Sequence, residues 1–272
     1  MKDKIKLIAL DVDGTLLRSD KTVDPETVSD IRYAVENGME TAFCTGRGLA
    51  EMGDLFDALP MMRFSICNSG AVVYDRAKDH CLYRNEIRQD CIREIMMAAG
   101  KYECMPHFLT ERESIVSSGD IRHMADFHMG IYQPMFLRVS RPVPDMRAES
   151  ERHEAIAKIN LYFRTVEELT KAFEELRHLP LTVSRSENTT MEMTAQGVSK
   201  AKGIERLADY LDISVTQTAG IGDNYNDVEM LTTVGLPIAM GNAIPEVRSL
   251  CAFVTDDNDH NGVGRAIRKI AG

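Results

Sequence analysis

A short apolar run that ends in two carboxylates constrains this chain more than any other feature. Residues 8–16 read Ile-Ala-Leu-Asp-Val-Asp-Gly-Thr-Leu, so Asp11 and Asp13 follow a predicted buried strand. Gly14 and Thr15 then predict a sharp turn. Two acids beside a core are costly unless a cation compensates them. Mg2+ is the usual solution, because it binds a few carboxylates together with phosphate oxygens and water.

Strand-like and helix-like segments alternate along the chain, and this alternation predicts an α/β fold. The predicted strands of the main sheet cover residues 5–10, 40–44, 64–67, 219–222 and 236–240. Between about 84 and 186 the pattern changes, with helices expected at 88–100 and 166–178. We therefore expect a core formed by residues 1–83 and 187–272 and a second domain inserted at 84–186. The polar stretch 140–153 is expected as a surface loop or a short helix.

The composition excludes several classes of protein. The net charge of −10 argues against a nucleic-acid surface, which needs a basic patch. The sequence contains no run of about 18 apolar residues, so no membrane span is expected. It starts without a signal-peptide pattern and its six cysteines form no CxxC pair, which favours a reducing cytoplasm.

Polar residues follow several of the predicted core strands. Each of them stands just after an apolar run: Asp11, Thr45, Ser69, Asp223 and Asn242. Ligands of open α/β sheets bind outside the carboxyl ends of the strands. The strand geometry therefore predicts that these distant residues meet at one edge of the sheet.

The first acid pair suits phosphoryl chemistry. Asp11 can attack phosphorus as a covalent nucleophile, since aspartate is known in this role. The backbone carbonyl of Asp13 is available to a metal, and its side chain can act as general acid and then as general base. After the second strand, the Thr45 hydroxyl and the Gly46 backbone can hold phosphoryl oxygens, and Arg47 can contact the phosphate.

A second acidic segment, Gly222-Asp-Asn-Tyr-Asn-Asp227, follows a later strand. Asp223 can complete the oxygen shell of the metal, and Asn226 can donate hydrogen bonds to phosphate. Asp227 can bind the metal or orient a lysine. That lysine is Lys200 or Lys202, and the spacing alone does not separate the two.

Four pieces in this order resemble the haloacid dehalogenase-like (HAD) hydrolase superfamily, in the Cof-type subgroup with a type IIB cap. The pieces are Asp11-Val-Asp13-Gly-Thr, Thr45-Gly46-Arg47, Lys200 after Gly-Val-Ser, and Gly222-Asp223-Asn-Tyr-Asn226-Asp227. The resemblance covers residues 1–83 and 187–272. It selects Lys200 over Lys202, and it departs at Ser69, where many relatives have Asn.

The resemblance implies a Rossmann-like, doubly wound parallel core with an α/β cap. It also implies Mg2+-dependent hydrolysis of phosphate monoesters through an aspartyl-phosphate on Asp11, with Asp13 as acid and base. The implied metal residues are Asp11, Asp13, Asp223 and Asp227. Asp13 favours phosphatase over dehalogenase chemistry, because a leaving alcohol needs a proton.

Several alternatives to a sugar phosphatase stay open at this point. The resemblance favours a sugar phosphate as substrate, with flavin mononucleotide and pyridoxal phosphate as the alternatives. The same aspartyl-phosphate chemistry serves a phosphotransferase or phosphomutase, and the same fold serves a non-catalytic sensor of phosphorylated ligands. We expect a monomer or small homo-oligomer whose partner is a small phosphate ester, with Arg185 and Asn188 as cap residues that face the substrate.

Overall fold

The computed structural model describes residues 4–152, 155–186 and 188–271, and these form two compact units. The core unit comprises the chain up to Gly46, Gly53–Tyr83 and the chain from Ser199 onward. The inserted unit comprises Arg84–Val198 together with the short segment Arg47–Met52. Among the described residues, no helix is both long enough and apolar enough to cross a membrane.

The core unit is built on an eight-stranded sheet with the order β14-β13-β12-β1-β2-β3-β4-β5. The strands in that order are Phe253–Val254, Leu236–Ala239, Thr218–Gly222, Leu7–Leu10, Glu40–Cys44, Phe64–Cys67, Val72–Asp75 and His80–Arg84. Strands β14 to β3 pair in parallel, and β4 pairs antiparallel to β3. The predicted parallel α/β core is confirmed.

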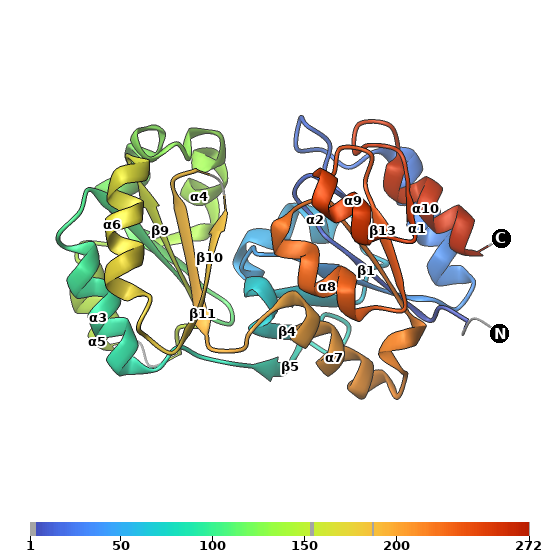
Figure 1. Ribbon diagram of the computed structural model, residues 1–272, viewed down its shortest axis with the longest axis horizontal. Helices are drawn as coiled ribbons and strands as arrows, with labels where there is room; N and C mark the ends of the chain where they lie inside the picture. The colour runs from blue at the N-terminus through green and yellow to red at the C-terminus, as the bar shows by residue number, and fades with distance from the viewer. Residues whose placement is uncertain (1–3, 153–154, 187, 272) are drawn as a thin grey trace. The chain divides into compact units, whose positions relative to one another are not determined.

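Helices cover both faces of this sheet. They are α1 (Pro25–Glu36), α2 (Gly53–Ala58), α7 (Lys200–Leu211), α8 (Val228–Thr233), α9 (Pro245–Leu250) and α10 (Gly262–Ala271). In Figure 1 the strands run between a layer with α7 and α8 and a layer with α1 and α10. The order of the strands requires this arrangement, because right-handed crossovers from β1 to β2 and from β12 to β13 pass on opposite faces.

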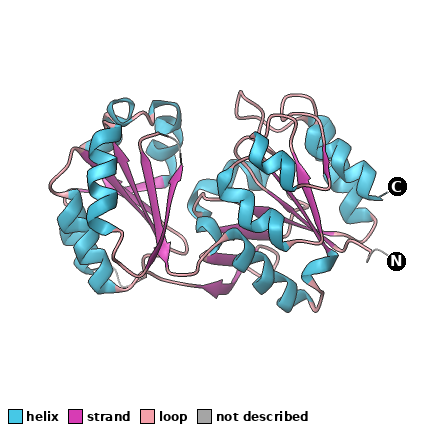
Figure 2. Ribbon diagram, viewed as in Figure 1, coloured by secondary structure: helices cyan, strands magenta, loops and turns pink. Residues whose placement is uncertain are grey.

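The inserted unit has its own six-stranded sheet, with the order β10-β11-β9-β6-β7-β8. These strands are Leu181–Ser186, Thr190–Ala195, Lys158–Phe163, Cys104–Leu109, Ser114–Ser117 and Ser140–Val143. The helices α3 (Gln89–Ala99), α5 (Met146–Arg152) and α6 (Val166–Leu176) pack with one face of the sheet around Phe108, Ile159 and Phe163. Figure 2 shows these helices in cyan beside the magenta strands. The segment that ends in α4 (Gln133–Val139) packs against Met105 and Tyr162, on the other face.

Two details of the inserted unit differ from the expectations. Within its described part, the stretch 140–153 contains the short helix α5, one of the two expected alternatives, but it begins with strand β8, because Ser140–Val143 pairs in parallel with β7. The inserted unit also ends at Val198 and not at 186. The reason is β11, which pairs antiparallel with both β10 and β9 and so extends the inserted sheet.

Candidate active site

A buried cation lies between two buried carboxylates at the carboxyl edge of the core sheet. The Nζ atom of Lys200 donates to Asp11 Oδ1 at 2.5 Å and to Asp227 Oδ1 at 2.6 Å. All three side chains are at most 5% exposed. Asp11 follows β1 directly, and Lys200 is the first residue of α7. The structure therefore pairs Lys200, and not Lys202, with the acids, whereas Lys202 forms an exposed ion pair with Glu205.

Asp227 has a second set of contacts that fixes the acidic loop. Its Oδ2 accepts from the backbone N–H groups of Asp223, at 2.9 Å, and Asn224, at 3.2 Å. Both oxygens of Asp227 are thus engaged, one with Lys200 and one with the loop. These contacts favour the orienting role over direct metal ligation, the two roles that the sequence left open.

Residues of the first motif, which follows β1, contact the Asp223 carboxylate. Thr15 Oγ1 donates to Asp223 Oδ1 at 3.0 Å, across 208 positions of the chain. Gly14 has φ +86°, and a Cβ added there would lie 2.5 Å from Asp223 Oδ2, so the close approach requires glycine. Asn242 Nδ2 donates to the carbonyl oxygen of Gly14 at 2.8 Å. The sequence alone indicates only a turn at Thr15, and its hydroxyl two positions after Asp13 is the signal for this additional contact.

The electrostatics of the site favour a bound cation. Burial raises the pKa of Asp11 well above its ordinary value, and the charge of Asp227 adds to the rise. Burial likewise raises the pKa of Asp223 to about 6, again with Asp227 contributing. Burial opposes the charge of Lys200, but Asp11 and Asp227 hold the pKa of Lys200 well above its usual range. The site therefore contains more negative charge than Lys200 alone can stabilise.

The ligating atoms of Asp11, Asp223 and Asp227 lie within 4.8 Å of one another. Carboxylate oxygens are the ligands that Mg2+ prefers. The carboxylate of Asp13 is not part of this group; its Oδ1 accepts from Lys21 Nζ at 3.1 Å. A metal role for Asp13 stays a prediction that rests on its backbone carbonyl.

The predicted phosphate-binding residues divide between the two units. Thr45 is buried at the end of β2, and its carbonyl oxygen accepts from Ser69 N–H at 3.0 Å, so these two residues adjoin. Asn226 is exposed on the turn after β12. Arg47 belongs to the inserted unit, where its Nη1 lies 4.0 Å from Met135 Sδ. A phosphate contact by Arg47 stays a prediction.

The two residues expected to face the substrate from the cap lie on the surface. Both Arg185 and Asn188 are exposed. The Arg185 guanidinium lies 4.3 Å from the centre of the Phe173 ring, against helix α6. Their contact with substrate stays a prediction.

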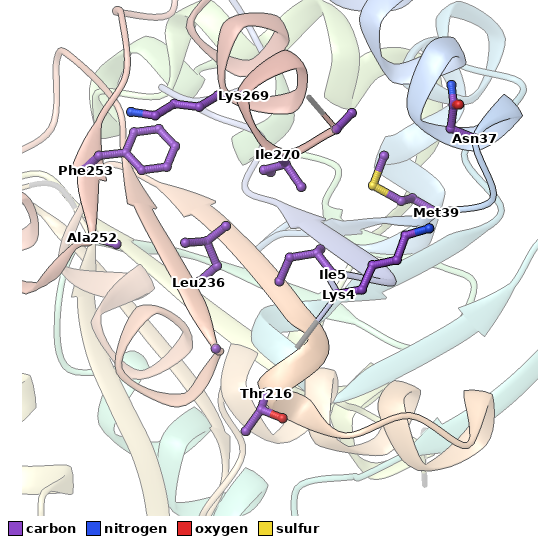
Figure 3. A pocket seen from close by; sticks show the side chains of 12 residues that line it. Lys4, Ile5, Asn37, Met39, Thr216, Leu236, Ala252, Phe253, Lys269 and Ile270 are labelled. Carbon is purple, nitrogen blue, oxygen red and sulfur yellow. The ribbon is translucent and has the colours of Figure 1, made fainter. Parts of the chain in front are cut away.

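A separate cavity of 760 Å³ lies at the opposite edge of the core sheet. It is lined by Ile5, before β1, by Met39, before β2, and by Leu236, the first residue of β13 (Figure 3). Lys269 Nζ lies 3.8 Å from the centre of the Phe253 ring at its rim. Ligands of open α/β sheets bind at the carboxyl ends of strands, so this cavity is not the catalytic site.

Comparison with known proteins identifies the family. The family model described as haloacid dehalogenase-like hydrolase matches residues 8–267. The 5-amino-6-(5-phospho-D-ribitylamino)uracil phosphatase YcsE of Bacillus subtilis (strain 168) is 28% identical over 264 residues, which cover 97% of this chain and 95% of that protein.

Two solved structures share both units of the fold. A phosphatase of the haloalkanoate enzyme superfamily from Bacteroides thetaiotaomicron has a TM-score of 0.82 at 27% identity, over 98% of this chain and 96% of its own. A subclass IIB sugar phosphatase has a TM-score of 0.84 at 21% identity, over 98% and 99%, and supports the fold alone. The chain belongs to the haloacid dehalogenase-like hydrolase family.

Proposed function

We propose that this chain is a Mg2+-dependent phosphatase that hydrolyses small-molecule phosphate monoesters through an aspartyl-phosphate on Asp11. The single observation that carries the proposal is the buried arrangement of Asp11, Lys200 and Asp227 beside Asp223. Three carboxylates and one ammonium gather at this edge of the sheet. Burying them is unfavourable unless a ligand compensates their charge.

The donor set fits a divalent cation. Three carboxylates and one ammonium leave two negative charges in excess when all four groups are ionised. Asp11 and Asp223 would hold the ion, since both oxygens of Asp227 accept other hydrogen bonds. When bound, Mg2+ would withdraw negative charge from the phosphoryl oxygens and so favour attack by an anionic nucleophile.

The residues of the chain divide the reaction into two steps. A carboxylate oxygen of Asp11 attacks phosphorus, the bond to the ester oxygen breaks, and Asp13 gives its proton to that oxygen. Asp13 then takes a proton from water as the water oxygen attacks phosphorus and releases phosphate from Asp11. Thr45 and Ser69 would hold phosphoryl oxygens, and Lys200 would stabilise their charge.

We further propose a polyhydroxylated alkyl phosphate as substrate, with a sugar phosphate favoured. The curated relative is named for a phosphorylated ribitylamino compound, and the subclass IIB neighbour is named as a sugar phosphatase. Both names concern a phosphate ester of a polyol or sugar. These names support the substrate class without identifying the compound.

The test is turnover of a panel of phosphate esters with Mg2+. We expect Asp11→Asn to abolish phosphate release and to leave the melting temperature near that of the wild type. An acid-quenched wild-type reaction should carry phosphate on the Asp11 peptide, located by mass spectrometry. Asp209→Asn is the matched control, because it removes an exposed carboxylate of the same unit. Wild-type turnover by Asp11→Asn would refute the mechanism, and isomer formation without phosphate release would indicate a phosphomutase.

A further inference from the structure

A hairpin follows the first motif and returns the chain to Asp13. Leu17 N–H donates to the carbonyl oxygen of Val12 at 2.9 Å, and Asp13 forms a bridge with Leu17. At the tip of the hairpin, Lys21 N–H donates to the carbonyl oxygen of Arg18 at 2.9 Å. The Lys21 side chain spans the hairpin, and its Nζ donates to Asp13 Oδ1 at 3.1 Å.

The backbone at Lys21 is in an unfavourable conformation. Its φ of +66° lies in the left-handed region, where glycine and, to a lesser degree, asparagine and aspartate are the favoured residues. The ion pair with Asp13 does not offset this cost, because both side chains are about one-third exposed and exposed pairs contribute little stability. A lysine with left-handed backbone whose ammonium contacts the proposed general acid points to a role in function.

Other contacts hold the tip in place. Asp20 Oδ1 accepts from Thr22 N–H at 3.0 Å and from Thr22 Oγ1 at 2.6 Å. Ser19 donates from N–H and from Oγ to Asp259, at 2.9 and 2.7 Å. The backbone of Lys21 is therefore anchored independently of Asp13. The Lys21 side chain therefore extends from an anchored backbone. An anchored backbone is needed if the ammonium is to hold the Asp13 carboxylate in one orientation.

We propose that Lys21 is a positioning residue that holds the Asp13 carboxyl for proton transfer to the leaving oxygen. The inference rests on the proposed function, in which Asp13 is the general acid. As the bond between phosphorus and the ester oxygen breaks, its electron pair moves to that oxygen and the Asp13 proton follows. The hydrogen bond from Lys21 Nζ to Asp13 Oδ1, at 3.1 Å, orients the carboxyl group for this transfer. Lys21 itself neither gives nor takes a proton.

The substitution Lys21→Gly separates this role from a structural one. Glycine accepts the left-handed backbone without strain, so the hairpin should keep or gain thermal stability while it loses the ammonium. The readout is the first-turnover release of alcohol or nitrophenol, measured by rapid quench with Mg2+. An alkyl phosphate needs a proton on its leaving oxygen, whereas p-nitrophenyl phosphate does not.

We expect Lys21→Gly to slow alkyl release about 10-fold, part of the roughly 10²–10⁴-fold that general acids supply. Nitrophenol release should change less than about 2-fold, since its leaving oxygen needs no general acid. Lys21→Arg should restore most of the alkyl rate, because it returns a cation to the same position. Asp212→Gly is the matched control: it removes a left-handed aspartate, φ +53°, at the end of α7 and should change neither rate.

The outcomes distinguish the inference from the function on which it rests. Equal loss on both substrates would mean that Lys21 acts on the fold or on Asp11, which overturns the inference. If Lys21→Gly loses no rate on either substrate, the inference about Lys21 is also wrong. Asp13→Asn then still tests whether Asp13 is the general acid. If Asp13→Asn itself releases alcohol at the wild-type rate, Asp13 is not the general acid and the inference fails, whereas Asp11→Asn decides separately whether the phosphatase proposal holds.

Discussion

The substitution Gly70→Ala tests how the fold holds Lys200 against its two carboxylates. Gly70 ends a turn of three consecutive residues with positive φ, of which Asn68 has 52°, Ser69 57° and Gly70 101°. A Cβ on Gly70 would lie 2.0 Å from the carbonyl oxygen of Ser199 and 3.1 Å from the backbone nitrogen of Lys200. Alanine therefore cannot enter this position unless the first turn of α7 moves away.

The magnitude of the effect follows from these distances. Ordinary contact begins near 3.4 Å, so the start of α7 must withdraw by about 1.4 Å, the difference between 3.4 and 2.0 Å. Lys200 Nζ now lies 2.6 Å from Asp227 Oδ1, and a withdrawal of that size breaks the hydrogen bond. A misplacement of about 1 Å costs about 10²-fold in rate. The left-handed backbone adds about 1–2 kcal/mol of destabilisation.

The assay is kcat with Mg2+ at saturating substrate, together with the free energy of unfolding in urea. Gly38→Ala is the matched control, because Gly38 also has a positive φ, 80°, but has no atom within 4 Å of an added Cβ. That variant should lose only the backbone strain, about 1–2 kcal/mol, and keep its kcat. If Gly70→Ala retains full kcat, the argument that this turn positions Lys200 is wrong.

Two further predictions concern the acidic loop. Because the pKa of Asp223 is raised to about 6, its contribution to the stability of the metal-free protein is complete below about pH 4 and is lost as the pH rises to about 6, by at most about 3 kcal/mol. Mg2+ needs the ionised carboxylate, so it should raise the melting temperature more at pH 7.5 than at pH 5, and an equal rise at both would contradict the metal role of Asp223. Asp227→Asn should cost about 1–3 kcal/mol of stability and about 10²-fold in kcat, because the amide must direct N–H toward Lys200 or toward backbone N–H donors. Urea unfolding and initial rates check this, and an unchanged kcat would contradict the role of Asp227 in orienting Lys200.

Much of the core could be predicted because its signals are local. A buried parallel strand is a short apolar run, and the residue after it lies at the carboxyl edge of the sheet. Because Asp11, Thr45 and Asp223 each follow a predicted strand, the sequence alone predicts that they lie at the same edge of the sheet. The end of the inserted unit was predicted wrongly, because β11 pairs with β9 across the chain and such pairing leaves no local pattern.

The contacts that orient the side chains of the site depend instead on tertiary geometry. Spacing could not separate Lys200 from Lys202, which are two positions apart in the same helix. Their difference arises because Ser199 caps α7 and Gly70 lets the backbone approach it closely, which sets the first residue of the helix toward Asp11 and Asp227. A glycine in a turn has many sequence explanations, and only the 2.0 Å between an added Cβ and the Ser199 carbonyl oxygen shows that this position requires glycine. The motifs thus specify which groups we propose to react, while the close backbone approach sets the distance between Lys200 and its two carboxylates.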